Sequence, residues 1–411
     1  MEYGLIGMPL GHSYSKELHE RIGGYSYELH ELRPEELDGF FQERSFRGIN
    51  VTIPYKQAVI PYLDEISDTA RQIGAVNTVV NRGGRLIGYN TDYAGMLALV
   101  QHSGITVSGK KVLILGTGGT SKTAYAVMSS LGAAEIRKVS RRGEDGALTY
   151  EEAAMNHADA DIIVNTTPVG MYPKTEAMPL ELSAFPRLSG VLDAVYRPLR
   201  TELVMHAREK GIPAEGGLYM LCAQAVRAME LFLDREADPA LLESAFRSLQ
   251  ADKENIVLIG MPTCGKTTVG GVLARKTGKT FADTDVQLAE KIGSVPDYIR
   301  AHGEAAFRVS ERETVAATAM ESSQIIATGG GVVLVPENLW SLRKNGRLVF
   351  LNRSLSLLKP SPDRPLSSTP EALKALYETR FPLYQAAADL TVPADGTPDE
   401  VAELVLRALA E

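Results

Sequence analysis

Eight residues in the second half of the chain have the types and spacing of a phosphate-binding loop. Residues 260–267 read Gly-Met-Pro-Thr-Cys-Gly-Lys-Thr, and the four positions that the motif requires are held by Gly260, Gly265, Lys266 and Thr267. An apolar run at 255–259 predicts a strand that leads into the loop, and a helical pattern at 268–276 leads out. Backbone N–H groups and a helix N-terminus would therefore face phosphate oxygens. The pattern predicts ATP or GTP, with Lys266 on the β- and γ-phosphates and Thr267 on Mg²⁺.

Carboxylates and glycines downstream of this loop suit a site for phosphoryl transfer. Asp283 and Asp285 are two positions apart, so on an extended strand both would point to one face, one toward a metal and the other toward a substrate hydroxyl. Three glycines at 329–331 follow a strand predicted over 324–327 and permit close backbone approach to a ligand. Within the loop, Cys264 is expected to be a passive residue, with a redox-sensitive thiol at a helix N-terminus as the alternative.

A different glycine-rich turn lies in the first half of the chain, after an apolar strand predicted over 111–115. Its glycines are Gly116, Gly118 and Gly119. Ser121 stands at the third glycine position of the dinucleotide-binding fingerprint. The next predicted strand ends in Ser140, Arg141 and Arg142. An NAD site usually has an acidic residue there, whereas arginine suits the 2′-phosphate of NADP, so the pattern favours NADP. A glycine turn without cofactor and a solvated basic turn are the alternatives.

Polar residues gather at other predicted strand ends of the first half. They lie at 11–15, 50–56, 75–78 and 88–92. Strand C-termini are where α/β sheets bind ligands, and hydroxyls, amides, one lysine and one aspartate suit a polyhydroxylated acid. Any one of these residues alone would be an ordinary turn or cap, but their joint occurrence favours a substrate site.

Length and composition limit the possible classes of protein. The chain has 411 residues, which predicts two or three domains. A net charge of −8 argues against nucleic acid or an anionic membrane as the main partner. The two cysteines and the absence of metal-type Cys/His spacing argue against a disulfide scaffold or a structural zinc site. No apolar run reaches 18 residues and the start lacks signal-peptide features, so a cytoplasmic protein is expected; the oligomeric state stays open.

The alternation of strand and helix patterns predicts an α/β fold with βαβ units and a mostly parallel sheet. In the first hundred residues, strands are predicted at 4–7, 27–32 and 48–52, with helices at about 14–22 and 34–45. A long amphipathic helix is predicted over 218–233. Residues 247–254 are polar and form the best domain boundary, and 359–369 is rich in Pro, Ser and charge, which predicts a loop.

Residues 1 to about 248 resemble shikimate dehydrogenase. The matching motifs are Gly7-Met8-Pro9, His12-Ser13-Tyr14-Ser15, Asn50-Val51-Thr52-Ile53-Pro54-Tyr55-Lys56, Gly88-Tyr89-Asn90-Thr91-Asp92, Asn165-Thr166-Thr167-Pro168-Val169-Gly170-Met171 and Gly217-Leu218-Tyr219-Met220-Leu221-Cys222-Ala223-Gln224. The resemblance implies a substrate domain at 1–101, completed by a helix at about 226–248, and a Rossmann NADP-binding domain at 102–225.

The resemblance also implies the residue roles of this half. Lys56 and Asp92 would be the catalytic pair, and the sequence leaves open which of the two donates the proton. The substrate would be held by Ser13, Ser15, Thr52, Asn77, Asp92, Tyr196 and Gln224. NADP(H) would contact Gly116, Gly118, Gly119, Ser140, Arg141, Arg142, Gly217 and Met220. Tyr219 stands where glycine is common, close to the expected nicotinamide.

Residues 255 to about 395 resemble shikimate kinase, which implies a P-loop domain related to nucleoside monophosphate kinases, with a parallel sheet, at 253–411. ATP would contact Gly260, Cys264, Gly265, Lys266, Thr267, Thr268 and Arg364, and Mg²⁺ would contact Thr267 and Asp283. Shikimate would be held by Asp285, Arg308, Gly330 and Arg380. Lys266 and Asp285 would also be catalytic, the latter on the attacking hydroxyl.

Two departures from this second family lie near the nucleotide. Thr263 and Cys264 replace a smaller pair, and threonine is expected to be tolerable if its φ stays negative. The segment between Leu358 and Arg364 is short, and Lys359 is expected to take a role usually given to an additional arginine.

Together the two resemblances imply a bifunctional enzyme of aromatic amino-acid biosynthesis that uses NADP(H), ATP and Mg²⁺. It would reduce 3-dehydroshikimate to shikimate and then phosphorylate shikimate. One alternative changes the substrate to quinate, which some dehydrogenases of this kind use. Another makes one half a ligand-binding module without turnover, against which the lysines, aspartates and arginines named above argue.

Overall fold

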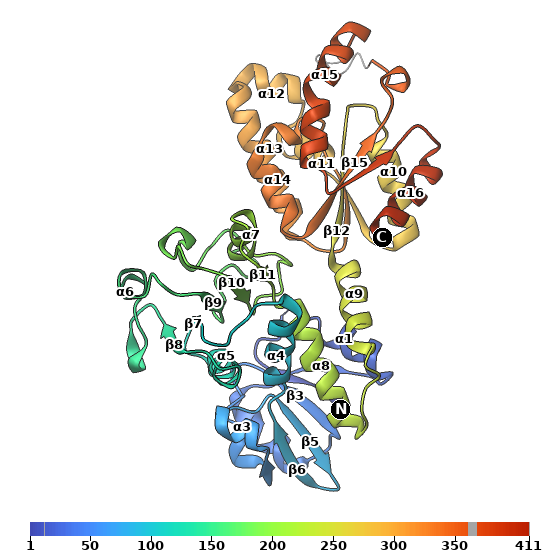
Figure 1. Cartoon of the computed structure of the whole chain (residues 1–411). Helices are drawn as coiled ribbons and strands as arrows, with labels where there is room; N and C mark the ends of the chain where they lie inside the picture. Colours follow the sequence, from blue (N-terminus) through green and yellow to red (C-terminus); the bar gives the residue numbers. More distant parts are fainter. Residues whose placement is uncertain (12, 361–367, 411) are drawn as a thin grey trace. The chain divides into compact units, whose positions relative to one another are not determined.

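The described residues form three β-sheets, one with six strands and two with five (Figure 1). The computed structural model describes residues 1–11, 13–360 and 368–410. Its contacts divide the chain into two compact units, Met1–Gln250 with the first two sheets and Ala251–Glu411 with the third. The predicted α/β fold class is confirmed. Among the described residues, no helix combines the length and apolar character needed to cross a membrane.

The first sheet is mixed rather than mostly parallel. Its strand order is β2-β1-β3-β5-β6-β4, built from β1 Tyr3–Gly7, β2 Glu28–Glu31, β3 Gly48–Val51, β4 Glu65–Ile66, β5 Thr78–Arg82 and β6 Arg85–Tyr89. β5 runs antiparallel to both β3 and β6. The hairpin between β5 and β6 was not predicted, although its turn, Gly83-Gly84 with φ of 61° and 91°, is the kind of dipeptide that signals one. The helices of this layer are α1 Ser15–Gly23, α2 Leu37–Glu43 and α3 Asp68–Ile73.

The second sheet is wholly parallel, with the order β11-β10-β9-β7-β8. Its strands are β7 Lys111–Leu115, β8 Glu135–Val139, β9 Ile162–Asn165, β10 Gly190–Asp193 and β11 Ala214–Glu215, and its helices are α5 Gly119–Ser130, α6 Tyr150–Asn156 and α7 Glu202–Glu209. Buried apolar residues fill both faces of the central strands, as parallel sheets require. Two long helices, α4 Thr91–Ser103 and α8 Leu218–Leu233, pack along one another beside this sheet (Figure 1).

The polar stretch predicted as a domain boundary is helical. Helix α9, Leu241–Lys253, contains residues 247–253, and Leu249 within it is fully buried in the core of the first unit. Within the second unit, Lys279 Nζ donates to the carbonyl oxygens of Ala251 and Asp252, in the last turn of α9, and of Glu254, which follows it, at 2.6–2.9 Å. A cation that satisfies unpaired C-terminal carbonyls stabilises a helix end.

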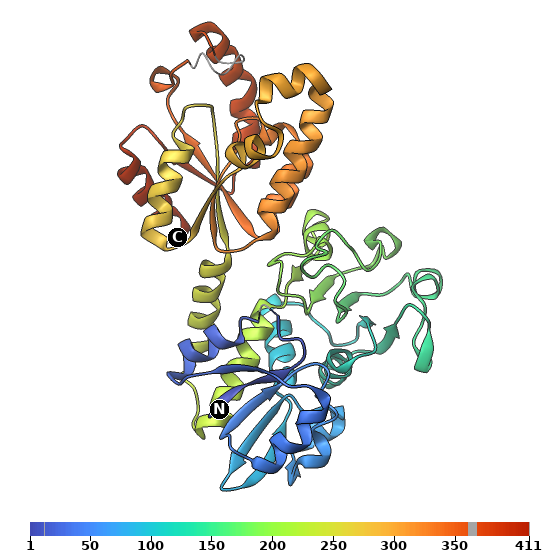
Figure 2. The ribbon, with the colours of Figure 1, turned by 180° about the vertical axis from the view of Figure 1, so that it is seen from behind.

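The third sheet is parallel, with the order β13-β14-β12-β15-β16. Its strands are β12 Asn255–Ile259, β13 Thr280–Asp283, β14 Gln324–Ala327, β15 Gly346–Asn352 and β16 Leu390–Pro393. Helices cover both of its faces (Figures 1 and 2): α10 Lys266–Thr277, α11 Thr284–Ile292, α12 Val295–His302, α13 Glu304–Met320, α14 Pro336–Arg343, α15 Pro370–Ala387 and α16 Pro398–Ala410. The strands predicted at 255–259 and 324–327 are confirmed.

Candidate functional site

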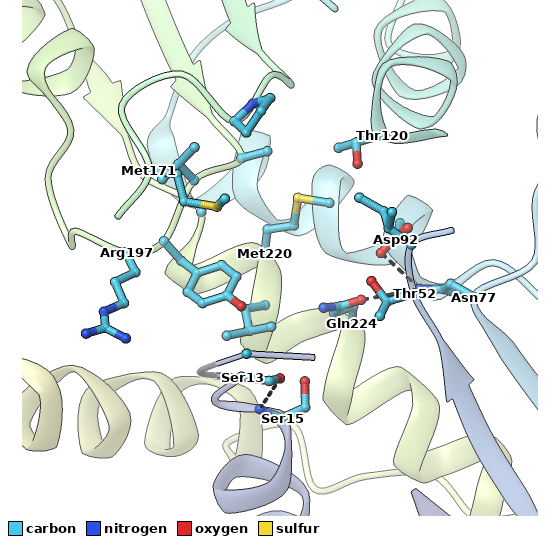
Figure 3. Close-up of a pocket in the computed structure, with 18 of the residues that line it drawn as sticks. Ser13, Ser15, Thr52, Asn77, Asp92, Thr120, Met171, Arg197, Met220 and Gln224 are labelled. Carbon is cyan, nitrogen blue, oxygen red and sulfur yellow. Dashed lines mark hydrogen bonds between the residues drawn. The ribbon is translucent and has the colours of Figure 1, made fainter. Parts of the chain in front are cut away.

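A cavity of about 760 Å³ opens in the first unit (Figure 3). Segments that follow β1, β3, β9 and β10 line it together with the start of α8, so strand ends of both sheets meet there. All eight side chains predicted for the substrate and for catalysis line this one cavity: Ser13, Ser15, Thr52, Lys56, Asn77, Asp92, Tyr196 and Gln224. Two residues predicted for the cofactor, Gly217 and Met220, line it as well.

Lys56 and Asp92 form an ion pair in the wall of the cavity. The ammonium nitrogen lies 2.6 Å from Oδ2 of Asp92, and the two side chains are 19% and 7% exposed. Asp92 is the second residue of α4, whose N-terminal dipole favours a carboxylate there. Its other oxygen accepts a hydrogen bond from Asn77 Nδ2 at 2.9 Å, and the same amide lies 3.3 Å from Gln224 Oε1. The carboxylate is therefore held on both oxygens, which fixes the direction of the lysine.

Hydroxyls and one histidine line another part of the cavity. In Figure 3, Ser13 and Ser15 lie on one side of the Gln224 amide, and Met171 and Met220 lie on the other. Ser13 Oγ accepts a hydrogen bond from the backbone N–H of Ser15 at 3.2 Å, which orders the entry into α1.

Sequence reasoning missed His19, which also lines the cavity. Its ring stacks on Tyr27 at 4.2 Å, and its Nδ1 lies 2.8 Å from the Tyr25 hydroxyl. Burial lowers the pKa of His19 to about 3, so the imidazole is neutral at physiological pH. Its spacing from Ser15 on one helix, four residues on, was the available signal.

The predicted dinucleotide turn adjoins the ion pair. Gly116 has φ of 110°, and a Cβ there would lie 2.8 Å from Thr166 Oγ1, so the turn accepts only glycine without rearrangement. Gly118 caps α5 and Gly119 begins it, and a Cβ at Gly119 would lie 3.9 Å from Cδ of Lys56. The helix N-terminus therefore opens next to the lysine, as a phosphate-bearing cofactor requires.

The basic residues after β8 lie away from the cavity. Arg141 is exposed, and Arg142 lies 3.6 Å from Glu144 in an exposed ion pair. Ser140 Oγ accepts a hydrogen bond from the backbone N–H of Gly143 at 3.1 Å. None of the three lines the cavity, and all three follow the end of β8 directly. In a dinucleotide fold, the end of the second strand is where the adenosine ribose is bound.

The Tyr219 ring packs against aromatic side chains of α4 and α9. Its ring stacks on His102, with centroids 3.8 Å apart and planes at 13°, and meets the Phe246 ring at 5.0 Å. It is not among the residues that line the cavity, whereas its neighbour Met220 is. Adjacent residues on a helix point about 100° apart, so the two side chains serve different surfaces.

Asp193 is a buried acid that sequence reasoning also missed. It ends β10, where its oxygens accept hydrogen bonds from Asn165 Nδ2 at 3.0 Å, the backbone N–H of Val195 at 3.0 Å and the Thr201 hydroxyl at 2.6 Å. Burial raises the pKa of this carboxyl from 3.8 to about 7. These bonds fix the segment that carries Tyr196 into the cavity.

In the second unit, the phosphate-binding loop joins β12 to α10. Gly260 and Gly265 have φ of 148° and 103°, as the tight loop requires. Lys266 is 8% exposed, and its Nζ donates to the carbonyl oxygens of Gly260 at 2.9 Å and Met261 at 3.0 Å. The ammonium is thus bound within the loop that would take the β- and γ-phosphates.

The condition stated for Thr263, a negative φ, is not met, because its φ is 62°. Left-handed backbone costs a non-glycine residue about 1–2 kcal/mol, and a β-branched residue there is an outlier. The hydroxyl of Thr263 donates to the Lys359 carbonyl oxygen at 3.0 Å and accepts from the Lys359 N–H at 3.3 Å. Next to it, Cys264 is 1% exposed within the apolar core, which agrees with a passive loop residue.

The two aspartates after β13 do not share the face of a strand. Asp283 ends the strand and caps α11, where it accepts from the backbone N–H of Asp285 at 3.0 Å, while Asp285 lies in the first turn of that helix. Thr267 donates its hydroxyl to Asp283 at 2.8 Å. A hydroxyl and a carboxylate this close suit a Mg²⁺ ion that completes its shell with phosphate oxygens and water.

The glycine turn at 329–331 is surrounded by the other predicted groups. A Cβ at Gly329 would collide with Oδ1 of Asp285, and a Cβ at Gly330 would lie 3.1 Å from Pro262 of the phosphate loop. A Cβ at Gly331 would lie 3.1 Å from Nη1 of Arg308. The three glycines therefore bring Asp285, the phosphate loop and Arg308 to one place, and the closest approach is at Gly329.

Two buried side chains hold this turn by hydrogen bonds. The carbonyl oxygen of Gly330 accepts from Nη1 of Arg380 at 2.9 Å and from the hydroxyl of Tyr384 at 2.6 Å. Arg308 is paired with Glu304 at 3.3 Å and Glu311 at 2.9 Å. Thr268 is exposed on α10, and the predicted Arg364 lies outside the described residues. Tyr384 was missed, although it lies one helical turn after Arg380.

Comparison with known proteins matches the two units to different families. The family model "Shikimate dehydrogenase substrate binding domain" matches residues 5–79, and the model "Shikimate kinase" matches residues 262–410. A shikimate dehydrogenase (NADP(+)) from Symbiobacterium thermophilum is 36% identical over 270 residues, covering 59% of this chain and 92% of that protein.

Solved structures give the same relationship. The crystal structure of shikimate dehydrogenase 1 from Peptoclostridium difficile is 34% identical with a TM-score of 0.57, covering 61% of this chain and 98% of that one. A shikimate dehydrogenase from Thermus thermophilus, in complex with NADP(H) and shikimate, is 34% identical with a TM-score of 0.53, covering 60% and 99%. The chain therefore belongs to the shikimate dehydrogenase family and carries a shikimate kinase domain at residues 262–410.

Proposed function

We propose that the chain is a bifunctional enzyme that reduces 3-dehydroshikimate with NADPH and then phosphorylates the resulting shikimate with ATP. The observation that carries the proposal is the presence, in one chain, of the Lys56–Asp92 cavity and of the Asp285, Arg308 and phosphate-loop cluster. The similar proteins are named as NADP-dependent shikimate dehydrogenases, which supports the first reaction. The match to the shikimate kinase family model supports the second reaction.

The reduction would take place beside the ion pair. Bound NADPH would supply a hydride to the carbonyl carbon of 3-dehydroshikimate, and the carbonyl oxygen would receive a proton. Lys56, held toward the cavity by Asp92, suits an oxygen that becomes an alkoxide, because an ammonium both stabilises the charge and can donate the proton. Asp92 would keep the lysine charged and oriented, and Ser13, Ser15, Asn77 and Gln224 would bind the carboxylate and ring hydroxyls.

NADP would lie across the glycine turn, with its pyrophosphate at the N-terminus of α5 and its 2′-phosphate near Arg141. Gly217 and Met220, which line the cavity, would face the nicotinamide. We assign the substrate domain to 1–101 together with about 226–248, the NADP domain to 102–225 and the kinase domain to 253–411. The single helix expected over about 226–248 is in fact the end of α8, Leu218–Leu233, and the start of α9, Leu241–Lys253.

The phosphorylation would act on the hydroxyl that the first step forms. ATP would lie on the phosphate loop with Lys266 at its β- and γ-phosphates, and Mg²⁺ would be held by Thr267, Asp283 and phosphate oxygens. Arg308 and Arg380 would bind the shikimate carboxylate, Gly330 would contact the ring through its backbone, and Asp285 would accept the hydroxyl proton.

An assay on the purified chain tests the proposal. With 3-dehydroshikimate, NADPH, ATP and Mg²⁺ the expected product is shikimate 3-phosphate. Lys56→Ala should stop the first step only and Lys266→Ala the second only, each by at least about 100-fold. Loss of both activities from either substitution would contradict two independent sites. Faster oxidation of quinate than of shikimate would contradict shikimate as the substrate of the first unit.

A further inference from the structure

The phosphate loop of the second unit contains one residue whose backbone conformation is unfavourable for its type. Thr263 is the only β-branched residue with a positive φ in the part of the chain that the structure describes. Two of the other non-glycine residues with positive φ, Arg44 and Asp234, end helices, where a left-handed residue is common. Thr263 caps no helix, so another contact must compensate for its conformation.

The compensating contact is the pair of hydrogen bonds to Lys359. One hydroxyl donates to the Lys359 carbonyl oxygen at 3.0 Å and accepts from the Lys359 N–H at 3.3 Å, across 96 positions of sequence. Among residues 1–11, 13–360 and 368–410, Thr263 is the only hydrogen-bond partner of the Lys359 backbone. Within the described residues, this one side chain thus bonds both backbone groups of Lys359.

The contact brings a second lysine to the loop that already holds Lys266. Lys359 is exposed and follows the buried Leu358, so its backbone is fixed on one side by the core and on the other by Thr263. Lys266 is bound inside the loop by the carbonyls of Gly260 and Met261. A triphosphate with Mg²⁺ still carries negative charge, and a lysine on a flexible four-carbon stem can follow it.

We propose that Thr263 is a positioning residue of the kinase site, which fastens Lys359 to the phosphate loop so that both lysines neutralise the bound nucleotide. The inference rests on the proposed kinase function. In this role, the hydroxyl of Thr263, and not its backbone, contributes to the affinity for the nucleotide. Glycine in the same position would relieve the backbone but would leave Lys359 unfastened.

Substitutions that separate the hydroxyl from the backbone test this role. Thr263→Val keeps the β-branch and removes the hydroxyl, and Thr263→Ser is the matched control that keeps the hydroxyl. Thr263→Val should raise the KM for ATP about three- to ten-fold and leave kcat within about two-fold, since one pair of neutral hydrogen bonds is lost. Thr263→Ser should stay within about two-fold in both. Thr263→Gly, which carries no strain, should behave like Thr263→Val and covers the case in which valine prevents folding.

A double-mutant cycle tests the route through Lys359. Lys359→Met should raise the KM for ATP by a similar factor, and Thr263→Val should add less than about two-fold in the Lys359→Met background. Full additivity of the two effects would overturn the proposal, and so would an unchanged KM for ATP in both Thr263→Val and Thr263→Gly.

A readout that needs no turnover separates this inference from the proposed function. Hydrogen exchange at the Lys359 amide should accelerate several-fold in Thr263→Val and Thr263→Gly and stay unchanged in Thr263→Ser. Binding of MgADP by calorimetry should weaken in the same order. If the wild type fails to phosphorylate shikimate, these two measurements still decide the inference, and unchanged exchange in Thr263→Val and Thr263→Gly would overturn it.

Discussion

Tyr384 donates a hydrogen bond of 2.6 Å to the carbonyl oxygen of Gly330, and the tyrosine side chain is fully buried. Its ring stacks on Phe350 at 5.3 Å, so the hydroxyl is presented from a fixed position in the core. Arg380 donates to the same oxygen. With its carbonyl held twice, the peptide of Gly330 has a fixed plane, which orients the backbone groups of the turn toward the proposed substrate.

Removal of the Tyr384 hydroxyl should weaken shikimate binding in the kinase reaction. Tyr384→Phe retains the ring stacking and removes one of the two hydrogen bonds to Gly330, so we expect the KM for shikimate to rise about three- to ten-fold while the KM for ATP stays within about two-fold. Steady-state kinetics of ADP formation measures both. Tyr377→Phe on the same helix is the matched control, because Tyr377 stacks on Phe381, whereas Tyr384 stacks on Phe350. Equal effects of the two substitutions would contradict a specific role for Tyr384.

Neutralisation of Asp92 should slow the reduction without changing the shape of the cavity. Asp92→Asn keeps the shape of the side chain but removes the charge that pairs with Lys56 at 2.6 Å, so we expect the rate of dehydroshikimate reduction to fall about 100-fold or more. The KM for NADPH should change little, because Asp92 belongs to the substrate set. Stopped-flow measurement of NADPH oxidation follows the chemical step.

Two comparisons control the Asp92 experiment. Kinase activity of Asp92→Asn should equal that of the wild type, because Asp92 lies in the first unit. Asn77→Asp, which replaces the donor to the other oxygen of Asp92 with a second acid, should also slow reduction. A reduction rate of Asp92→Asn within a few-fold of wild type would remove Asp92 from the catalytic pair.

Much of this architecture was predictable because its strands are short apolar runs with clear ends. The runs at 111–115, 255–259 and 324–327 form strands with those bounds, since parallel strands buried on both faces need continuous apolar sequence. The hairpin at 78–89 was not predicted, although its Gly83-Gly84 turn is of a type that favours hairpins. Its antiparallel ladders explain why the first sheet is mixed.

The errors at the sites arise from orientation, which periodicity does not determine. Asp285 lies on a helix because Asp283 caps that helix, so the two-residue spacing no longer puts both carboxylates on one face. Thr263 takes a left-handed backbone because a contact with Lys359 compensates it, and that contact joins residues 96 positions apart. Tyr219 turns from the cavity because His102 and Phe246 offer it an aromatic contact. Each outcome depends on a side-chain contact that the local pattern does not reveal.

Asp193 should make the stability of the first unit depend on pH. Burial raises the pKa of this carboxyl from 3.8 to about 7, so the folded state binds a proton more tightly than the unfolded state. Its contribution to stability is therefore fully present below about pH 4 and is lost as pH rises through 7. Between about pH 6 and pH 8 we expect the wild type to lose about 1 kcal/mol of stability from this group.

Asp193→Asn isolates that contribution. The amide oxygen can keep the hydrogen bonds from Asn165 and Val195, and the amide nitrogen can donate to the Thr201 hydroxyl. The variant should therefore gain stability relative to wild type as pH rises from 6 to 8, measured as the difference between their melting temperatures by calorimetry. A difference that stays constant with pH would show that Asp193 is ionised throughout this range.

Arg141 should determine the preference for NADP over NAD. It is exposed and near the end of β8, whereas the neighbouring Arg142 is 3.6 Å from Glu144, whose charge offsets its own. Arg141→Gln should lower kcat/KM for NADPH about ten-fold or more and leave kcat/KM for NADH within about two-fold, because a guanidinium pairs with a phosphate but is not needed by a hydroxyl. Arg142→Gln is the matched control and should have the smaller effect. Equal losses with NADPH and NADH in Arg141→Gln would mean that Arg141 supports the fold of the turn and does not read the 2′-phosphate.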